Sequence, residues 1–311
     1  MSRNHYLFLL LPVAAGMACS SPSSPGGGSG GSQIIVVDGG GNDRIVGFDN
    51  MEGGHWTPLS TTAPGGIALD ASGRIYVTDG TNHRIVRFDD LAGTGMVTYG
   101  SAGTGTGQFG YPSGVAVDLT GHIYIADEGN SRVVRIDDMN GTNWAEIGTH
   151  GTGVGKFDVP AAIFVDGGNR IYIAEYSLDE IVRFDDMSGS NWTTYGSNGP
   201  GVDQFESPRA LFVDAAGRIY VADDLNNRVV RINDMSGAGW AEVKHDAGNA
   251  AHVLAGPAGV WAADGKVYIS SYKGAYVTQT DDDMSGSNWV SFGTKGAGVN
   301  QFNQPYGIVV H

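Results

Sequence analysis

Six prolines recur through this 311-residue chain at a nearly constant spacing. Successive prolines lie 48 residues apart, except for one interval of 49. The six are Pro64, Pro112, Pro160, Pro208, Pro257 and Pro305. A period of this length indicates that each repeat is one supersecondary unit, which buries its hydrophobic face only against its neighbours. The chain is therefore restricted to a repeat architecture. The secondary structure of one repeat determines the type of architecture.

Each repeat contains four short apolar runs separated by turn residues. In the repeat that opens at Pro112, the first run is SGVAVD, the second is Ile123–Asp127 and the third is Arg132–Ile136. A fourth run surrounds Trp144. Period-two alternation and the enrichment in β-branched residues predict four antiparallel strands. Units of four strands that recur every 40–50 residues are typical of the blades of a β-propeller.

The composition agrees with many short strands joined by tight turns. Glycine occurs 50 times, without a collagen period, and aromatic residues make up 10% of the chain. The 18 basic and 33 acidic residues give a net charge of −15. This charge argues against nucleic acid as a partner, because nucleic-acid binding depends on clustered Lys and Arg at phosphates.

The two ends of the repeat region complement one another. The chain ends with Tyr306–His311, which is an inner strand alone, and the region begins at Gln33 with a unit that lacks its inner strand. Joining the two ends completes a sixth blade and leaves no open edge. We therefore predict an all-β fold over residues 33–311. It is a six-bladed β-propeller of four-stranded antiparallel blades, closed by pairing the C-terminal inner strand with the N-terminal strands.

The segments Gln108–Asp118, Gly121–Asp127 and Asn130–Ile136 together resemble an NHL repeat. The resemblance recurs in every blade of residues 33–311 and implies the propeller fold. NHL propellers include ligand-binding scaffolds, RNA binders, receptor sensor domains and a few lyases. The resemblance therefore does not imply a particular function.

The first 19 residues have the pattern of an export signal. Tyr6–Ala15 is an uncharged apolar run of ten residues, which spans only about half of a bilayer core and is typical of a signal peptide. Gly16–Cys19 resembles the lipobox of bacterial lipoproteins, although Gly16 stands where that motif usually has Leu. The resemblance implies that Cys19 is lipidated and becomes the mature N-terminus. The alternative is an ordinary secretory signal that leaves a free thiol.

Residues 20–32 (SSPSSPGGGSGGS) form a low-complexity segment that predicts a flexible tether. A tether of this length holds the folded part about 20 Å from its anchor. Because no Asp follows Cys19, the lipoprotein resemblance implies an outer-membrane location in the cell envelope. We expect a monomer that contacts the membrane only through its lipid anchor. A single cysteine excludes an internal disulfide.

Most acidic residues occupy repeated positions, and we interpret them as structural. One set ends the inner strands, where Asp bonds its own backbone in a turn. A second set should pair with arginines across the second hairpin. These are, in turn, Asp70, Asp118, Asp166 and Asp214, and then Asp79, Asp127 and Asp223 with Arg84, Arg132 and Arg228.

A turn of the type Asp-Asp-Met-x-Gly-x-x-Trp also recurs, as at Asp137–Trp144. Repeated carboxylates can attract calcium, which takes 6–8 oxygen ligands. Adjacent side chains diverge on a strand or turn, so we interpret these acids as solvated. We predict no cofactor, and calcium remains the open alternative.

The direction of the strands assigns every loop to one of two faces. We call the face with the blade-to-blade loops and the second-to-third-strand loops the connector face, and the opposite face the turn face. Five basic residues fall outside the repeat pattern and the signal, and all are expected in connector-face loops. They are Lys156, Arg209, Lys244, Lys273 and Lys295. Residues outside the pattern are where function is usually added to a repeat scaffold.

The residue after each repeat proline is expected near the mouth of the central channel. Two of these six are large, and two second-to-third-strand loops also depart from the repeat. The predicted ligand-binding residues are Arg209, Tyr306, Glu175, Tyr176, Tyr272 and Lys273. Arg and Lys beside tyrosines suit an anionic or sugar-like ligand, or the acidic loop of a partner. Further along the inner strands, Phe164, Phe212 and Trp261 replace smaller residues, and we interpret them as packing between blades.

No catalytic or metal-binding motif is recognisable. His83, His150, His245 and His252 fall in connector-face loops, but no two histidines share a repeat position, whereas a catalytic metal needs three convergent ligands. We therefore predict a binding scaffold for a small ligand, a glycan or a protein. The alternatives are a metal-assisted lyase or hydrolase at the axial channel and, least favoured, a calcium-stabilised structural module.

Overall fold

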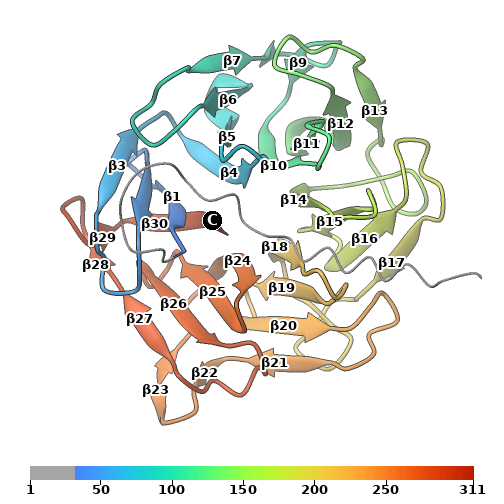
Figure 1. Ribbon diagram of the computed structural model, residues 1–311. Helices are drawn as coiled ribbons and strands as arrows, with labels where there is room; N and C mark the ends of the chain where they lie inside the picture. Colours follow the sequence, from blue (N-terminus) through green and yellow to red (C-terminus); the bar gives the residue numbers. More distant parts are fainter. Residues whose placement is uncertain (1–31) are drawn as a thin grey trace, which may run out of the picture.

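The computed structural model describes residues 32–311, which form a ring of six four-stranded antiparallel sheets (Figure 1). Blade 1 holds β1 (Ile34–Gly39), β2 (Arg44–Phe48), β3 (Thr57–Ser60) and β30 (Gln304–Val310). Blade 2 holds β4 (Pro64–Leu69), β5 (Ile75–Asp79), β6 (Arg84–Phe88) and β7 (Val97–Tyr99). Blade 3 holds β10 (Pro112–Val117), β11 (Ile123–Asp127), β12 (Arg132–Ile136) and β13 (Ala145–Ile147).

In blade 1 the order from the axis outward is β30, β1, β2, β3, and in every other blade it is the order of the chain. Blade 4 holds β14 (Pro160–Val165), β15 (Ile171–Glu175), β16 (Glu180–Phe184) and β17 (Thr193–Tyr195). Blade 5 holds β18 (Pro208–Val213), β19 (Ile219–Asp223), β20 (Arg228–Ile232) and β21 (Ala241–Val243). Blade 6 holds β24 (Pro257–Ala263), β25 (Lys266–Ser271), β26 (Tyr276–Asp281) and β27 (Val290–Phe292). The predicted all-β propeller is confirmed.

The remaining short elements lie between strands. Two 3-10 turns, η1 (Gly80–Asn82) and η2 (Glu128–Asn130), follow β5 and β11. Two parallel pairs occur in blade-to-blade loops: β8 (Ser101–Ala102) with β9 (Gln108–Phe109), and β28 (Thr294–Lys295) with β29 (Gln301–Phe302). The hairpin β22 (His245–Asp246) and β23 (Asn249–Val253) projects at the rim of the ring (Figure 1).

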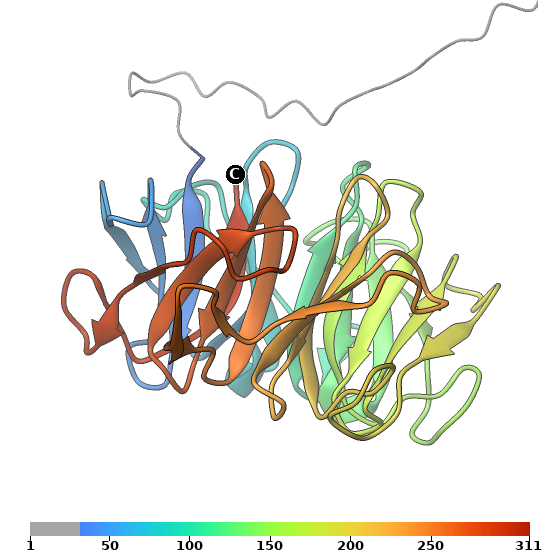
Figure 2. The same ribbon diagram turned by 90° about the horizontal axis from the view of Figure 1, so that it is seen from below.

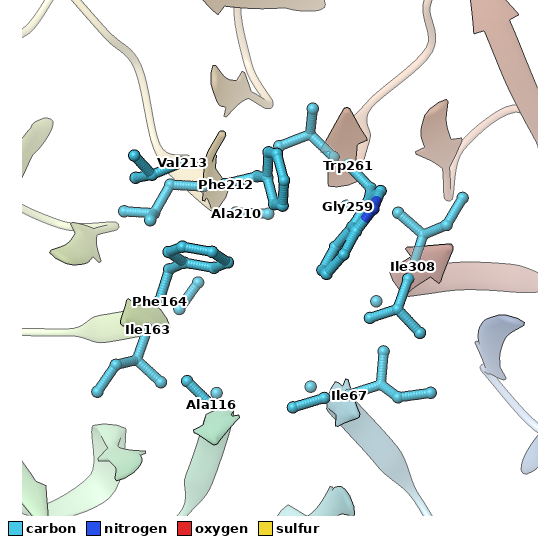
Figure 3. Close-up of a pocket in the computed structure, with 18 of the residues that line it drawn as sticks. Ile67, Ala116, Ile163, Phe164, Ala210, Phe212, Val213, Gly259, Trp261 and Ile308 are labelled. Carbon is cyan, nitrogen blue, oxygen red and sulfur yellow. The ribbon is translucent and has the colours of Figure 1, made fainter. Parts of the chain in front are cut away.

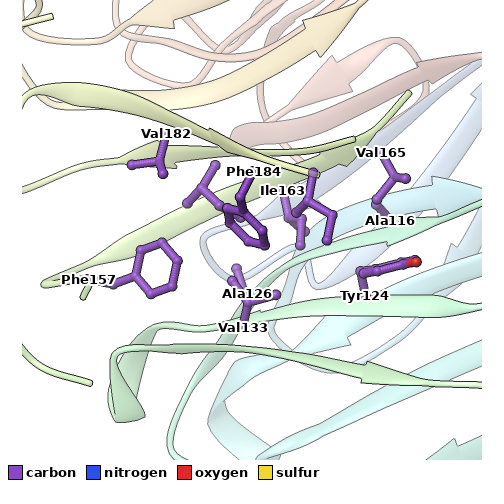
Figure 4. Packing of buried hydrophobic residues seen from close by; sticks show 11 residues of the cluster. Ala116, Tyr124, Ala126, Val133, Phe157, Ile163, Val165, Val182 and Phe184 are labelled. Carbon is purple, nitrogen blue, oxygen red and sulfur yellow. The ribbon is translucent and has the colours of Figure 1, made fainter. Parts of the chain in front are cut away.

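The hydrophobic core lies between neighbouring blades. Figure 4 shows one such interface, in which Tyr124 and Val133 of blade 3 share a hydrophobic cluster with Phe184 of blade 4 and with Phe157 of the loop between the two blades. The second strands of blades 1 to 5 are buried along their whole length, because each presents its alternate residues to the blades on either side. Packing of this kind fixes the position of every inner strand around the axis.

The ring is closed by the two ends of the repeat region. β1 pairs antiparallel with β30 and opposes Ile34 to Val310. Reciprocal backbone hydrogen bonds of 2.9 Å between Gln33 and His311 extend this ladder. The predicted closure is confirmed. Both Ser32 and His311 border the turn-face end of the axial channel, so the described chain enters and leaves the ring on that face (Figure 2).

The predicted acid–arginine pairs across the second hairpin are confirmed in three blades. The distances from the arginine Nε to the carboxylate are 2.8 Å for Arg84–Asp79, 3.0 Å for Arg132–Asp127 and 2.7 Å for Arg228–Asp223. Blade 1 has a fourth pair, Arg44–Asp38 at 3.0 Å. In blades 4 and 6 the corresponding residues differ, and the hairpins are held without such a pair.

The acids at the ends of the inner strands bond their own turns, as predicted. Oδ1 of Asp70 accepts from the backbone N–H of Ser72 at 2.9 Å and of Arg74 at 3.0 Å. The acids of the outer turns behave similarly, and hydrogen bonds from Ser188 lower the pKa of Asp186. Within residues 32–311, no three His, Cys, Asp or Glu side chains gather as a metal site would require.

The predicted signal peptide, lipidation of Cys19 and most of the tether fall on residues 1–31, outside the described residues. In the part that the structure describes, no helix has the length and apolar character needed to cross a bilayer.

Candidate functional site

The six inner strands enclose an axial channel of about 1640 Å³. Its wall is mainly aliphatic and small, and its two ends open on the connector face and the turn face. At the connector-face end, the wall includes the residue that follows each repeat proline. These six residues are Gly65, Ser113, Ala161, Arg209, Ala258 and Tyr306.

A second repeat position completes this mouth. In blades 2 to 6 it is the first residue after the second strand. In blade 1 it is the residue after Asp38, which aligns with the acids that end the other second strands. These six are Gly39, Gly80, Glu128, Tyr176, Asp224 and Tyr272. The two positions together give blades 4, 5 and 6 large polar and aromatic side chains, whereas blade 2 contributes only glycines. The charged side chains of the mouth thus lie on blades 3, 5 and 6, whereas at blade 2 the ring of Tyr111 lies against Gly80.

Arg209 is the centre of a cluster of polar and aromatic side chains at the mouth. Its guanidinium carbon lies 4.9 Å from the ring centroid of Tyr176 and 5.1 Å from that of Tyr272, so the cation is held between two aromatic rings. Its Nε and Nη2 donate to Oδ2 of Asp224 at 3.1 and 2.9 Å. Nη2 also donates to the hydroxyl of Tyr176 at 3.4 Å. These contacts fix the plane of the guanidinium.

Asp224 is completely buried and serves two cations at once. Besides Arg209, it accepts from Nζ of Lys273 at 3.0 Å and from the hydroxyl of Tyr272 at 3.2 Å. Burial acts to lower the pKa of Lys273, but the hydrogen bond and the charge of Asp224 outweigh it and raise that pKa. The pKa of Arg209 is raised for the same reasons. Two cations and one carboxylate leave this cluster with one net positive charge.

Two further residues border the cluster. The ring of Tyr306 stacks on Tyr272 with centroids 5.7 Å apart and an interplanar angle of 25°, and its hydroxyl donates to Gln304 at 2.9 Å. Glu128 lines the channel on blade 3, where burial raises its pKa although the charge of Arg209 and a hydrogen bond from Ser113 act in the opposite direction. The negative charges of the mouth thus lie beside its cations.

Five of the six predicted ligand-binding residues meet at this mouth: Arg209, Tyr306, Tyr176, Tyr272 and Lys273. Glu175 does not join them. Its buried carboxylate accepts from the backbone N–H groups of Asp158 at 2.9 Å and Val159 at 3.0 Å. The carboxylate of Asp127 does the same for Gly110 in blade 3. Glu175 therefore holds a blade-to-blade loop.

The sequence reasoning did not select Asp224 or Glu128 as site residues, because each directly follows a repeat acid. Aligning the six repeats would have identified both residues. The residue after the second-strand acid varies between blades as strongly as the residue after the proline does, whereas the acids themselves recur.

Among residues 32–311 the histidines do not gather at the axis, and of these only His311 lines the channel, at its turn-face end. His150 is exposed and lies 3.1 Å from Asp158. His245 and His252 belong to the hairpin β22–β23 at the outer rim, where His252 lies 3.2 Å from Asp246. The extra residue in the proline spacing falls between Trp240 and Pro257, the segment that contains this hairpin.

Three aromatic residues line the channel beneath the mouth (Figure 3). The ring centroids of Phe164 and Phe212 are 5.1 Å apart, and those of Phe212 and Trp261 are 4.4 Å apart. The three residues come from blades 4, 5 and 6, so they pack between blades as predicted. They also form a continuous aromatic wall along one side of the channel, which the sequence reasoning did not foresee.

Two segments of the chain, residues 61–88 and 109–136, match the sequence model of the NHL repeat. No curated protein matches the chain in sequence. The NHL resemblance is thus supported in blades 2 and 3 by sequence, and the structure extends the same blade pattern around the ring.

Solved structures show the same fold at low sequence identity. A chain in a crystal structure of a nidogen/laminin complex aligns with a TM-score of 0.69 and 19% identity over 90% of this chain and 98% of that chain. A protein of unknown function from Bacteroides caccae gives 0.64 and 12% over 90% and 99%. Virginiamycin B lyase from Staphylococcus aureus gives 0.55 and 17% over 78% and 75%. At these identities the likeness concerns the fold alone.

Proposed function

For this chain, whose NHL repeats build a six-bladed propeller, we propose the function of a cell-envelope lipoprotein that captures an anionic or sugar-like ligand at the connector-face mouth. The observation that carries the proposal is the guanidinium of Arg209 held between Tyr176 and Tyr272 above a buried Asp224. Propellers of this class serve many functions, so the argument rests on the mouth and not on the fold.

The cluster is ordered before any ligand arrives. Arg209 uses Nε and Nη2 for its contacts with Asp224 and Tyr176, and none of the described residues accepts a hydrogen bond from Nη1. A fixed guanidinium with a free donor favours carboxylate, phosphate or sulfate groups, because little side-chain entropy is lost on binding. The stacked rings of Tyr272 and Tyr306 add a flat surface on which a sugar ring or another ring packs.

The path of the chain supports capture away from the membrane. Ser32 lies at the turn-face end of the channel, opposite the Arg209 cluster. A lipid on Cys19 would therefore attach the propeller by its turn face and leave the connector face directed outward. This orientation suits a ligand, glycan or protein that approaches from the surrounding compartment.

The proposal is tested with glucuronate, which combines a carboxylate with a sugar ring. Saturation-transfer NMR of the wild-type chain should show binding, and the double variant Arg209→Ala with Tyr306→Ala should lose it while its thermal unfolding remains cooperative. Arg218→Ala is the matched control, because Arg218 pairs with Asp214 at 2.6 Å on the turn face. Binding that survives the double variant would refute the site. Stoichiometric zinc or iron in the purified protein would favour a metal-assisted enzyme.

A further inference from the structure

The aromatic wall and the cation cluster belong to the same three blades. Arg209 and Phe212 lie on the same strand, β18, three residues apart. At the rise of a β-strand this places them about 10 Å apart along the axis. Tyr176 and Phe164 flank them on blade 4, and Tyr272 and Trp261 do so on blade 6.

The opposite side of the channel carries aliphatic residues in place of aromatic ones. Ala116 in blade 3 occupies the strand position that Phe164 and Phe212 occupy in theirs, and Ala68 occupies it in blade 2. Figure 3 shows the three rings on one side of the opening, with Ala116 and Ile67 facing them across it. Space therefore remains beside the aromatic wall.

The wall has an energetic reason to take a ligand. Phe164 and Trp261 remain partly exposed although they belong to hydrophobic clusters, and their exposed surface lines the channel. Each Å² of apolar surface that a ligand covers contributes about 25 cal/mol. Rings packed at 4.4 and 5.1 Å form a preorganised surface for another flat ring.

We infer that the channel is a second binding compartment, continuous with the mouth, that takes the flat apolar or aromatic body of an amphiphilic anion. The anionic group binds Nη1 of Arg209, because Nε, Nη2 and Lys273 are already engaged by Asp224 and Tyr176. The ring system extends about 10 Å inward against Phe212. This inference rests on the proposed function, because it assigns the ligand class of the same mouth. The aromatic wall offers no polar partner to a charge, so the ligand carries its charge only at the end that binds Arg209.

The test uses naphthalene-2-sulfonate, a flat ring with one anionic end, measured by calorimetry. The expected result is 1:1 binding to the wild-type chain. Phe212→Leu, which keeps the site apolar but removes the ring, should weaken binding about 5-fold. Ala116→Phe should weaken it at least 10-fold, because it fills the space opposite the wall with a side chain that blades 4 and 5 accommodate at the same position.

Val154→Phe is the matched control, because it adds the same ring on an exposed loop, where Val154 is 74% exposed. It should bind like the wild-type chain. Glucuronate separates the two proposals: Ala116→Phe should retain glucuronate binding, and Arg209→Ala should lose both probes. Absence of naphthalene-2-sulfonate binding, or equal binding by wild type and Ala116→Phe, would overturn the inference. Glucuronate binding that persists in that case would leave the proposed function intact.

Discussion

The second hairpins of blades 4 and 5 have the same strand register but different charges opposite a buried acid, and burial raises the pKa of that acid in both. In blade 5, Asp223 opposes Arg228 in the strand register, and both side chains are at most 1% exposed. Arg228 also donates to the carbonyls of Gln204 at 2.7 Å and Pro200 at 2.8 Å, in the preceding blade-to-blade loop. In blade 4, the same two positions hold Glu175 and Glu180.

The difference shows which part of the repeat the fold requires. Glu175 keeps the contacts of the acid with the backbone of the blade-to-blade loop, but the cation that neutralises it elsewhere is absent from its opposing position. Burial accordingly raises the pKa of Glu175 to about 7, with smaller contributions from the charges of Asp158 and Glu180. Blade 4 thus preserves its geometry by holding a carboxyl group that is readily protonated.

The largest effect is expected when the pair of blade 5 is broken. Arg228→Ala leaves Asp223 buried without its cation and removes the ties to the preceding loop. We expect the free energy of unfolding to fall by ~3–5 kcal/mol. Urea denaturation measures this loss. A loss below ~1 kcal/mol would show that the pair contributes little to stability. The absence of such a pair would then cost blade 4 no stability.

The next effect depends on pH. Between pH 4.5 and about 7, folded Glu175 holds a proton that the unfolded chain has released, so stability falls as the pH rises through this window. The expected loss from this group is ~3 kcal/mol. Glu175→Gln should remove that part of the pH dependence, measured as the difference between unfolding curves at pH 5 and pH 8. Identical pH profiles for the two proteins would contradict the prediction.

A smaller effect is expected from repairing blade 4. Glu180→Arg restores the residue type of blade 5 opposite Glu175, and the new cation favours the ionised carboxylate. We expect stabilisation of ~1 kcal/mol at pH 8 and less at pH 5, where Glu175 is already protonated. Glu180→Gln serves as the control for removal of the like charge alone. Equal gains from both variants would show that the arginine itself adds nothing.

The smallest effect is expected at the exposed outer turns. Oδ1 of Asp186 and of Asp138 accepts hydrogen bonds from the backbone of its own turn, and both turns face solvent, so Asp186→Asn should leave the urea midpoint of unfolding unchanged. Millimolar calcium should leave the melting temperature of the wild-type chain unchanged. A calcium-dependent rise that Asp186→Asn abolishes would instead assign these turns a binding role.

The sequence predicts features that repeat and is weaker on features that occur once. The proline period predicts six blades and their closure, because identical units must be buried in the same way. It also led to Arg209 and Tyr306, since both interrupt a repeated position. Asp224 escaped because its neighbour Asp223 is a repeat acid. The aromatic wall was not predicted, because a large apolar side chain suits packing between blades and lining of the channel equally well.

The same limit explains Glu175. Its residue type departs from the aspartate of the repeat, which favours a functional interpretation, but a longer acid at this position still reaches the backbone N–H groups of the next loop. Only the direction of the side chain distinguishes ligand binding at the mouth from support of the loop. That direction depends on packing between neighbouring repeats.

The closure of the ring also determines how the protein bears mechanical load. β1 lies between β2 and β30 and is hydrogen-bonded to both along its length. A pull applied at Gln33 along the strand loads these two ladders in shear, so many hydrogen bonds share the force at once. A terminal strand at an open edge would instead peel away one bond at a time. A propeller that is anchored through its N-terminal segment therefore resists a pulling force at β1, where the ring is closed.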